Sequence, residues 1–279
     1  MDNIITQEHI DAYCRSLLAD ERAAGTISKY RRDLTAFAQW LDGRAVTKES
    51  ATAWKACLLN RDYAPRTVNS MLAAVNGFCR FAGLPIKLKF LSIQRQIFRD
   101  SSRELTKEEY DRLLTAARES GQERLALIME TLCATGIRVS ELRYITVEAA
   151  RAGRATITLK GKIRTILLST KLCRKLVKYA KKQKTASGEI FLTKSGRPIT
   201  RRQVWYELKR LCQAAGVYPG KVFPHNFRHL FATTFYKACK DIARLADVLG
   251  HSSIETTRIY LAVSGAEQAR QLDKLRLVS

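Results

Sequence analysis

The sequence is poor in acidic residues and lacks the patterns of a membrane or secreted protein. Only 26 Asp and Glu stand against 49 Lys and Arg, which gives a formal net charge of +23. No apolar stretch reaches the roughly 18 uncharged residues of a membrane span, and the acidic amino terminus lacks the apolar run of a signal peptide. We therefore expect a soluble cytoplasmic protein with no membrane partner.

The chain also lacks the signatures of disulfide frameworks and metal sites. Its seven cysteines are odd in number and contain no C-x-x-C pair, so neither a disulfide framework nor a zinc site is indicated. The carboxy-terminal region that carries the chemistry described below has no clustered Asp or Glu, no H-E-x-x-H and no D-x-D. Catalysis by a carboxylate-bound metal is therefore not favoured, and we expect no cofactor.

The basic excess lies mainly in the second part of the chain. Residues 1–104 carry 16 basic and 11 acidic side chains (net +5), whereas residues 105–279 carry 33 and 15 (net +18). Such an excess indicates a polyanionic partner, and nucleic acid is the first candidate. The 279 residues, of which 46% are hydrophobic, suffice for two domains with separate cores.

Apolar residues at three- and four-residue spacing predict a helical amino-terminal domain. Its four helices are expected at residues 6–19, 28–41, 47–60 and 65–81. A second domain begins where Thr106 and Glu109 form a capping box. We predict domain boundaries at 1–86 for the helical domain, 87–104 for a linker and 105–279 for a catalytic domain.

The second domain is predicted to be helical with one β-hairpin. The segments ATITLK and IRTILLS read as two short strands joined at Gly161-Lys162. Gly136 can end one helix in a left-handed cap, which places Arg138 near the start of the next. Further helices are expected near 107–119, 122–134, 170–183 and 201–215, with a tail helix near 265–277.

Near the carboxy terminus, two histidines, an arginine and a tyrosine are spaced so that they can act together on a phosphate group. A helix beginning at a proline carries His225 and Arg228, which are three residues apart and share one face. His251 follows the next helix, and a capping box starting at Ser252 places Tyr260 in the second or third turn of another. Each residue alone has an ordinary structural explanation, but together they indicate DNA strand transfer.

The chemistry of a phosphodiester explains this choice of residues. Arg138 and Arg228 can each bind two phosphate oxygens and offset their charge. A tyrosine is a weak nucleophile near neutral pH and needs a base or positive surroundings, which either histidine can provide. The leaving 5′ oxygen needs an acid, and Lys160 and Lys162 flank the turn of the hairpin.

On the motifs ATGIRVSEL, LKGK, HNFRH, LGHSS and TTRIY, which span residues 133–261, the chain resembles the tyrosine recombinases. These are the site-specific recombinases of the phage integrase and Xer type. The resemblance implies a mainly α fold, with a SAM-like four-helix core-binding domain before an α+β catalytic domain that carries a small β-hairpin. It also implies a prokaryotic, nucleoid-associated enzyme that acts through a 3′-phosphotyrosyl intermediate and a Holliday junction, without metal or ATP.

The resemblance assigns a role to each matching residue. Tyr260 is the expected nucleophile, His225 assists proton transfer, and Glu141 supports an arginine by a salt bridge. Lys160 is the expected general acid, with Lys162 as the alternative because the hairpin turn is about one residue shorter than is usual in the family. The phosphate and its transition state are held by Arg138, Arg228 and His251. His229 is interpreted as a packing or capping residue.

The expected partner is a double-stranded recombination site, bound by a homotetramer on two sites that is a monomer or weak dimer in solution. Accessory proteins are a further option. The tail helix at 265–277 is expected to dock into a neighbouring protomer, as in the family. The candidate DNA contacts are Lys29, Arg31, Arg32, Arg66, Thr67, Asn69, Ser70, Arg80, Arg164, Arg201 and Arg202.

Two other functions remain open on the sequence. A type IB topoisomerase uses a similar catalytic set but reseals the same strand, and a DNA-binding accessory protein would keep the charge without the activity. The compact helical first domain and the apolar tail favour recombination over relaxation. The biological task, integration and excision or resolution for a mobile element or replicon, stays undetermined.

Overall fold

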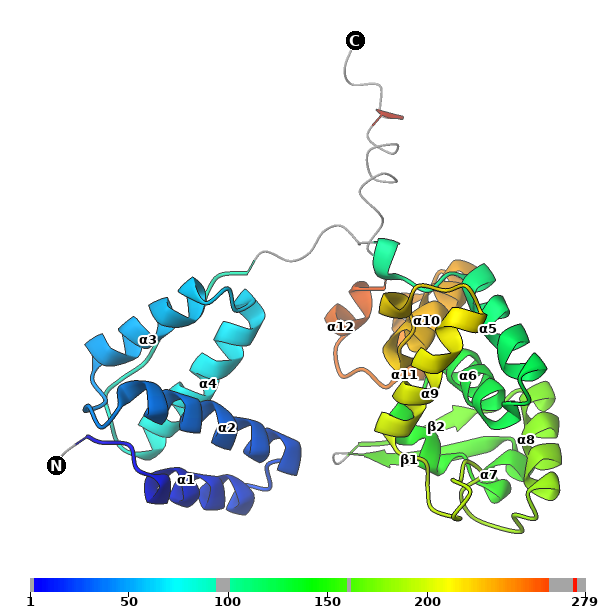
Figure 1. Ribbon diagram of the computed structural model, residues 1–279, viewed down its shortest axis with the longest axis horizontal. Helices are drawn as coiled ribbons and strands as arrows, with labels where there is room; N and C mark the ends of the chain where they lie inside the picture. Colours follow the sequence, from blue (N-terminus) through cyan, green and yellow to red (C-terminus); the bar gives the residue numbers. More distant parts are fainter. Residues whose placement is uncertain (1–2, 94–100, 160–161, 261–272, 275–279) are drawn as a thin grey trace. The chain divides into compact units, whose positions relative to one another are not determined.

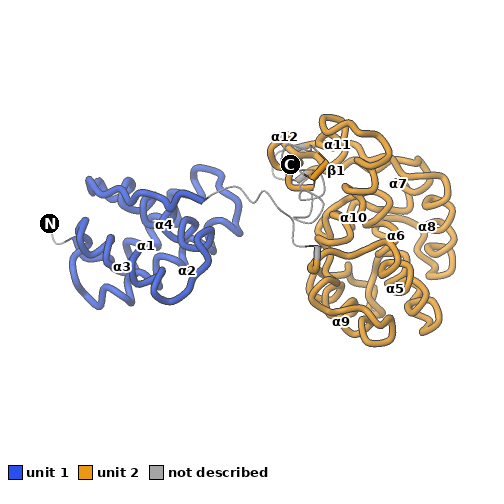
Figure 2. The backbone as a smooth tube through the Cα atoms, turned by 90° about the horizontal axis from the view of Figure 1, so that it is seen from above, with its two compact units in different colours: residues 1–95 blue, residues 96–279 orange. Residues whose placement is uncertain are grey.

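The computed structural model describes residues 3–93, 101–159, 162–260 and 273–274. The chain forms two compact units, residues 1–95 and residues 96–279, which are coloured separately in Figure 2. Within the described residues, no helix is both long enough and apolar enough to cross a membrane.

The first unit is a small helical bundle (Figure 1). Thr6 and Thr47 cap the first and third helices, because each side chain accepts a hydrogen bond from a backbone N–H of the first turn. Phe37 is fully buried and its ring centroid lies 4.7 Å from that of Trp54. The helices are α1 (Gln7–Ala19), α2 (Ala24–Leu41), α3 (Lys48–Asn60) and α4 (Pro65–Phe81).

The segment after α4 lies against that helix. The buried side chain of Asn76 accepts a hydrogen bond from the Leu88 N–H at 2.7 Å and donates to the Leu88 carbonyl at 2.9 Å. Asn69 makes the same pair of bonds to the backbone of Leu91, at 2.7 and 2.9 Å. The first residues of the predicted linker at 87–104 therefore pack on α4, and the Asn69 amide, a candidate DNA contact, bonds the backbone of Leu91 instead of facing solvent.

The second unit is built around α6, which packs against α5, α8, α9 and α10. Its helices are α5 (Lys107–Glu119), α6 (Glu123–Thr135), α7 (Val147–Ala152), α8 (Thr170–Lys182), α9 (Arg201–Ala214), α10 (Pro224–Cys239), α11 (Ile242–Leu249) and α12 (Ile254–Arg258). Short 3₁₀ helices are η1 (Ser101–Arg103), η2 (Val139–Tyr144) and η3 (Pro219–Lys221).

The predicted hairpin is confirmed as a two-stranded antiparallel sheet of β1 (Arg154–Leu159) and β2 (Lys162–Leu167). One face of the hairpin is buried through Ala155 and Ile157 on β1 and Ile166 on β2. The strand-like segment 188–193 forms isolated bridges and no strand. The mainly α fold with one small hairpin was therefore predicted correctly.

The predicted position of Tyr260 is wrong. The hydroxyl of Ser253, and not that of Ser252, caps α12 by accepting from the Glu255 N–H. The helix ends at Arg258, so Tyr260 lies two residues beyond it rather than in its second or third turn. The predicted tail helix at 265–277 lies outside the described residues apart from 273–274.

Replacing Asn76 by Leu should destabilise the first unit. The Leu88 N–H and carbonyl would lose their partner while staying buried, which costs about 1–3 kcal/mol. Urea unfolding followed by tryptophan fluorescence measures the loss, since Trp54 is buried in the same unit. Exposed Asn60 at the end of α3 gives a matched control, Asn60→Leu. Equal losses in the two variants would contradict this role of Asn76.

Candidate active site

Arg228 is the centre of the candidate site. It lies on α10 and is only 2% exposed. Its guanidinium donates to the carbonyl of Gly136 and, at 2.8 Å, to that of Leu249. The same group lies 2.9 Å from Nε2 of His251 and hydrogen-bonds Tyr260. One buried side chain of α10 thus joins the end of α6 to the segment 249–260.

The local sequence explains why these carbonyls meet Arg228. Gly136 and Gly250 follow the last residues of α6 and α11 and adopt left-handed φ values of 64° and 65°. The carbonyls at these helix ends have no intrahelical partner and carry the negative end of the helix dipole. A side chain at Gly136 would overlap the ring of Phe231. The two helix ends therefore form a preformed site for a cation.

The hydrogen bonds of His251 define its tautomer. A guanidinium can only donate, so Nε2 of His251 accepts the bond from Arg228. The proton of the neutral ring then lies on Nδ1, which donates to the Thr257 hydroxyl at 2.8 Å. Thr257 is fully buried. It therefore holds the ring in the orientation in which Nε2 points toward Arg228.

The electrostatics of the site favour an anion. Burial, and then the charges of Arg228, Arg138 and Arg164, lower the pKa of His251 from 6.5 to about 4, so this ring is neutral at pH 7. Burial and the two other arginines lower the pKa of Arg228 to about 10, opposed by Tyr260. Arg228 nevertheless stays charged at pH 7.

Arg138 lies in the loop that follows α6, directly before η2. Its backbone N–H donates to Glu141 at 2.7 Å and its Nη1 lies 3.1 Å from the other carboxylate oxygen. The predicted salt bridge between the two residues is therefore present. The side chain of Glu141 is 2% exposed, but that of Arg138 is 44% exposed. This arginine is held at its base and open to a ligand.

Tyr260 lies between two histidine rings. Its ring centroid is 6.0 Å from that of His251, nearly parallel to it, and 5.0 Å from that of His229. Tyr260 is 3% exposed. Nε2 of His229 lies 3.9 Å from a carboxylate oxygen of Glu104. His229 was interpreted as a packing residue, and the structure places it in contact with the predicted nucleophile.

His225 is the second residue of α10, one turn before Arg228, and it is exposed. Partial loss of water, and then the charges of Arg228, Arg138 and Arg201, lower its pKa below 6.5. His225 is therefore neutral at pH 7 and able to accept a proton. The effect of Arg201 shows that the first residue of α9 lies near the site.

The predicted hairpin acid cannot be placed. Lys160 lies outside the described residues, and for Lys162 the structure describes only the backbone, at the start of β2. Arg164, two residues further, was expected to contact DNA. Its side chain is 15% exposed and bonds Glu141 and the Val248 carbonyl instead.

The other candidate DNA contacts differ in how freely their side chains can act. Arg31 pairs with Asp11, while Lys29 and Arg32 both pair with Asp33. These cations are partly neutralised within the first unit. Arg31 and Arg32 are nevertheless exposed, as are Arg66, Thr67, Arg80, Arg201 and Arg202, while Ser70 is half-buried.

The contacts of Thr257 and Arg164 were not predicted from the sequence. Alternation does not identify Arg164, because both faces of the second strand carry apolar residues: Ile166 and Leu168 share the inward face of Arg164, while Ile163 and Leu167 are exposed. No pattern marks Thr257 either, whose partner His251 is met only through the fold.

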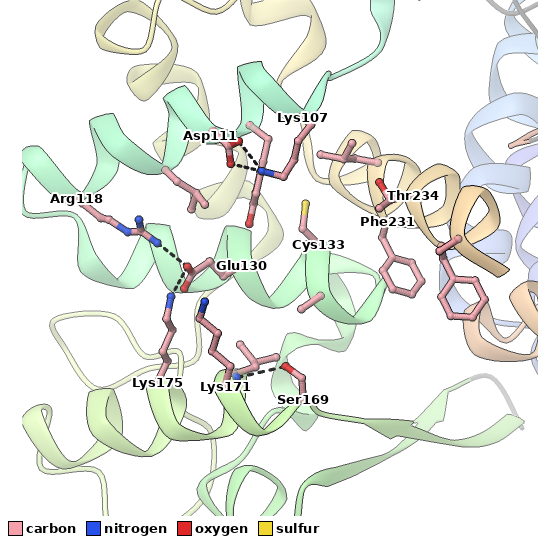
Figure 3. Close-up of a pocket in the computed structure, with 17 residues that line it drawn as sticks. Lys107, Asp111, Arg118, Glu130, Cys133, Ser169, Lys171, Lys175, Phe231 and Thr234 are labelled. Atoms are coloured by element: carbon pink, nitrogen blue, oxygen red, sulfur yellow. Dashed lines mark hydrogen bonds and ion pairs between the residues drawn. The ribbon is translucent and has the colours of Figure 1, made fainter.

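A cavity of the second unit lies apart from these residues. It measures about 730 Å³ and lies between α5, α6, α8 and α10 (Figure 3). Within it, Glu130 accepts from Arg118 and Lys175. None of the predicted catalytic side chains that the structure describes lines this cavity, and the candidate site is the arginine and histidine cluster around Tyr260.

Both units have known counterparts. Residues 10–83 match the phage integrase N-terminal SAM-like domain, and residues 103–267 match the phage integrase family. The chain is 30% identical to tyrosine recombinase XerC of Roseiflexus sp. (strain RS-1), over 94% of this chain and 91% of that protein.

Two solved structures share the fold. One is XerH recombinase bound to its difH substrate before cleavage, with a TM-score of 0.69 and 18% identity over 95% of this chain and 84% of the other. The second is a lambda integrase tetramer bound to a Holliday junction, with a TM-score of 0.74 and 20% identity over 93% and 78%.

The pKa of His251 predicts a loss of stability in acid. Its folded value of about 4 lies below the unfolded value of 6.5, so the unfolded chain binds a proton first as the pH falls. The free energy of unfolding should therefore decrease between pH 6.5 and 4, by no more than about 2 kcal/mol from this residue, because the ring keeps some contact with water.

Urea unfolding at several pH values measures how the free energy of unfolding changes with pH, and an NMR titration of the His251 ring gives its pKa. The His251→Asn variant should lack the part of this pH dependence that comes from His251. The matched control is His9→Asn, at an exposed histidine of the first unit, which should keep it. A titration midpoint for His251 above 6.5 would show that the ring is not held neutral.

Proposed function

The chain belongs to the phage integrase family and is an Xer-like tyrosine recombinase, and we propose that it cuts and rejoins DNA through a covalent bond to Tyr260. The observation that carries this proposal is the position of the Tyr260 phenol. It hydrogen-bonds the buried cation Arg228, and its ring lies against His251. The proposed nucleophile therefore lies directly beside the groups that would bind the phosphate.

In the cleavage step, Tyr260 Oη attacks the scissile phosphorus. The bond from phosphorus to the 5′ oxygen breaks, a 3′-phosphotyrosyl bond forms, and a 5′ hydroxyl is released. The phenol must lose a proton, and neutral His225 is suited to accept it. The 5′ oxygen must gain one. Lys160 of the hairpin is our first choice as its donor and Lys162 the alternative.

The transition state gains negative charge on the non-bridging oxygens, and the arginines are arranged to offset it. Arg138 is open to a ligand, whereas Arg228 is buried and pre-aligned by two helix ends. A phosphate oxygen that replaces Nε2 of His251 as the acceptor for Arg228 frees that nitrogen. The ring can then take up a proton there and donate to the phosphate.

The covalent link retains the energy of the broken bond. Attack by the 5′ hydroxyl of a partner strand breaks the phosphotyrosyl bond and restores the phenol, so strands are exchanged without ATP or a metal ion. Two successive exchanges pass through a Holliday junction. The similar lambda integrase tetramer on such a junction supports a homotetramer on two DNA sites for this chain.

The exposed basic residues outline a DNA interface on each unit. Arg66 and Thr67 lie in the first turn of α4, and Arg201 and Arg202 in that of α9. A helix amino terminus with exposed arginines suits phosphate binding. With a net charge of +23 for the chain, affinity should fall steeply with salt. The domain division at 87–104 is part of the same proposal.

Replacing Tyr260 by Phe should abolish the covalent adduct. The substrate is a pool of duplexes with a randomised central sequence and one nick, from which the short fragment bearing the 5′ hydroxyl diffuses away after cleavage. The wild-type protein should form a protein–DNA adduct in excess EDTA and without ATP. Tyr260→Phe should reduce it by at least about 10⁴-fold, since no other oxygen takes the place of the nucleophile.

Tyr236→Phe, at a half-buried tyrosine of α10, is the matched control and should still form the adduct.

Four other results would contradict the proposal. If Tyr260→Phe forms as much adduct as wild type, the nucleophile is another residue. Loss of activity in EDTA that Mg²⁺ restores would overturn the arginine-based mechanism. No adduct with wild type would favour an inactive DNA-binding protein. Relaxation without strand exchange between two recovered sites would favour a topoisomerase.

A further inference from the structure

Arg164 occupies the inward face of the hairpin at a point where three segments of the second unit meet. It lies on β2 in alternation with the buried residues Ile166 and Leu168. Its neighbours Ile163 and Thr165 are exposed on the opposite face. The guanidinium is therefore directed into the protein.

The first contact of Arg164 is with the carboxylate that holds Arg138. Its Nη2 donates to Glu141 Oε2 at 2.7 Å, and the same oxygen accepts from the backbone N–H of Arg138. The other oxygen of Glu141 receives Nη1 of Arg138 at 3.1 Å. Since the Glu141 side chain is 2% exposed, this buried carboxylate ties the hairpin to the loop of Arg138.

The second contact is with the end of α11. Nη1 of Arg164 donates to the Val248 carbonyl at 3.0 Å. The arginine side chain also passes directly over Gly250, where a Cβ would lie 2.5 Å from its Cδ. Gly250 precedes His251, and the carbonyl between these contacts, that of Leu249, binds Arg228. A shift of Arg164 would therefore move the turn that carries His251.

We propose that Arg164 is a positioning residue for strand cleavage, which holds Arg138 through Glu141 and the His251 turn through Val248 and Gly250. This inference rests on the proposed function. Both of its terminal nitrogens donate a hydrogen bond within the protein and its side chain is 15% exposed, so a phosphate contact is disfavoured. A planar fork can bond a carboxylate and a carbonyl at once, whereas a lysine ammonium at this position can reach only one of them.

The test separates the rate of cleavage from the affinity for DNA. Arg164→Met and Arg164→Lys are compared with wild type on a nicked duplex recovered as a covalent adduct from the randomised pool. At saturating protein, Arg164→Met should form the adduct about 10- to 100-fold more slowly, as expected for misplaced catalytic groups. The dissociation constant in a gel shift should stay within about twofold, with an unchanged salt dependence. Arg164→Lys should recover part of the rate.

A double-mutant cycle shows whether Arg164 acts through Arg138. In an Arg138→Lys background, Arg164→Met should slow the adduct by a smaller factor than in wild type, because the group it positions is already changed. The matched control is Arg154→Met, which removes an exposed charge from β1 of the same hairpin and should leave the rate unchanged.

Three results would overturn the proposal. An Arg164→Lys variant that cleaves as fast as wild type would show that the fork is not needed, even if Arg164→Met does not fold. If Arg164→Met instead binds DNA more weakly, with a reduced salt dependence, and forms the adduct at an unchanged rate, Arg164 is a phosphate contact. If the two substitutions slow adduct formation in the double mutant by the product of their separate factors, Arg164 does not act through Arg138. Failure of the proposed function looks different, because wild type itself would then form no adduct.

Discussion

The buried guanidinium of Arg228 is the interaction on which the site depends. A charge 2% exposed is costly to bury unless it is paired and hydrogen-bonded. Here the carbonyls at the ends of α6 and α11 and the groups of His251 and Tyr260 provide those bonds. The same bonds fix the distance between the loop of Arg138 and the turn of His251. Packing of the unit and geometry of the candidate site therefore both rest on one side chain.

The surroundings of this cation bind anions because positive charge exceeds negative charge there. Burial and the charge of Arg138 lower the pKa of Arg164 and that of Arg228, and Glu141 bonds both Arg138 and Arg164. Burial and the charges of the same three arginines also lower the pKa of His251, which keeps its ring neutral. The negative charge of a phosphodiester in the site would relieve this repulsion between the arginines. The same positive charges would then both bind the phosphate and stabilise its transition state.

Local signals predicted most of the helices, while the contacts of the site depended on the tertiary fold. Thr6, Thr47 and Thr106 cap helices where the sequence indicates, because a cap involves only neighbouring residues. Tyr260 was misplaced because two adjacent serines could cap α12 and the helix is short. The partner of Thr257 lies across a turn, and the partners of Arg164 lie in η2 and α11, where sequence spacing carries no signal.

The central claim is that Tyr260 becomes joined to a 3′ phosphate of DNA. The most direct measurement is mass spectrometry of the wild-type adduct after digestion with trypsin and nuclease. The account predicts a nucleotide attached through its 3′ phosphate to Tyr260, in the peptide that follows Arg258. A nucleotide on another residue, or one attached through a 5′ phosphate, would contradict it.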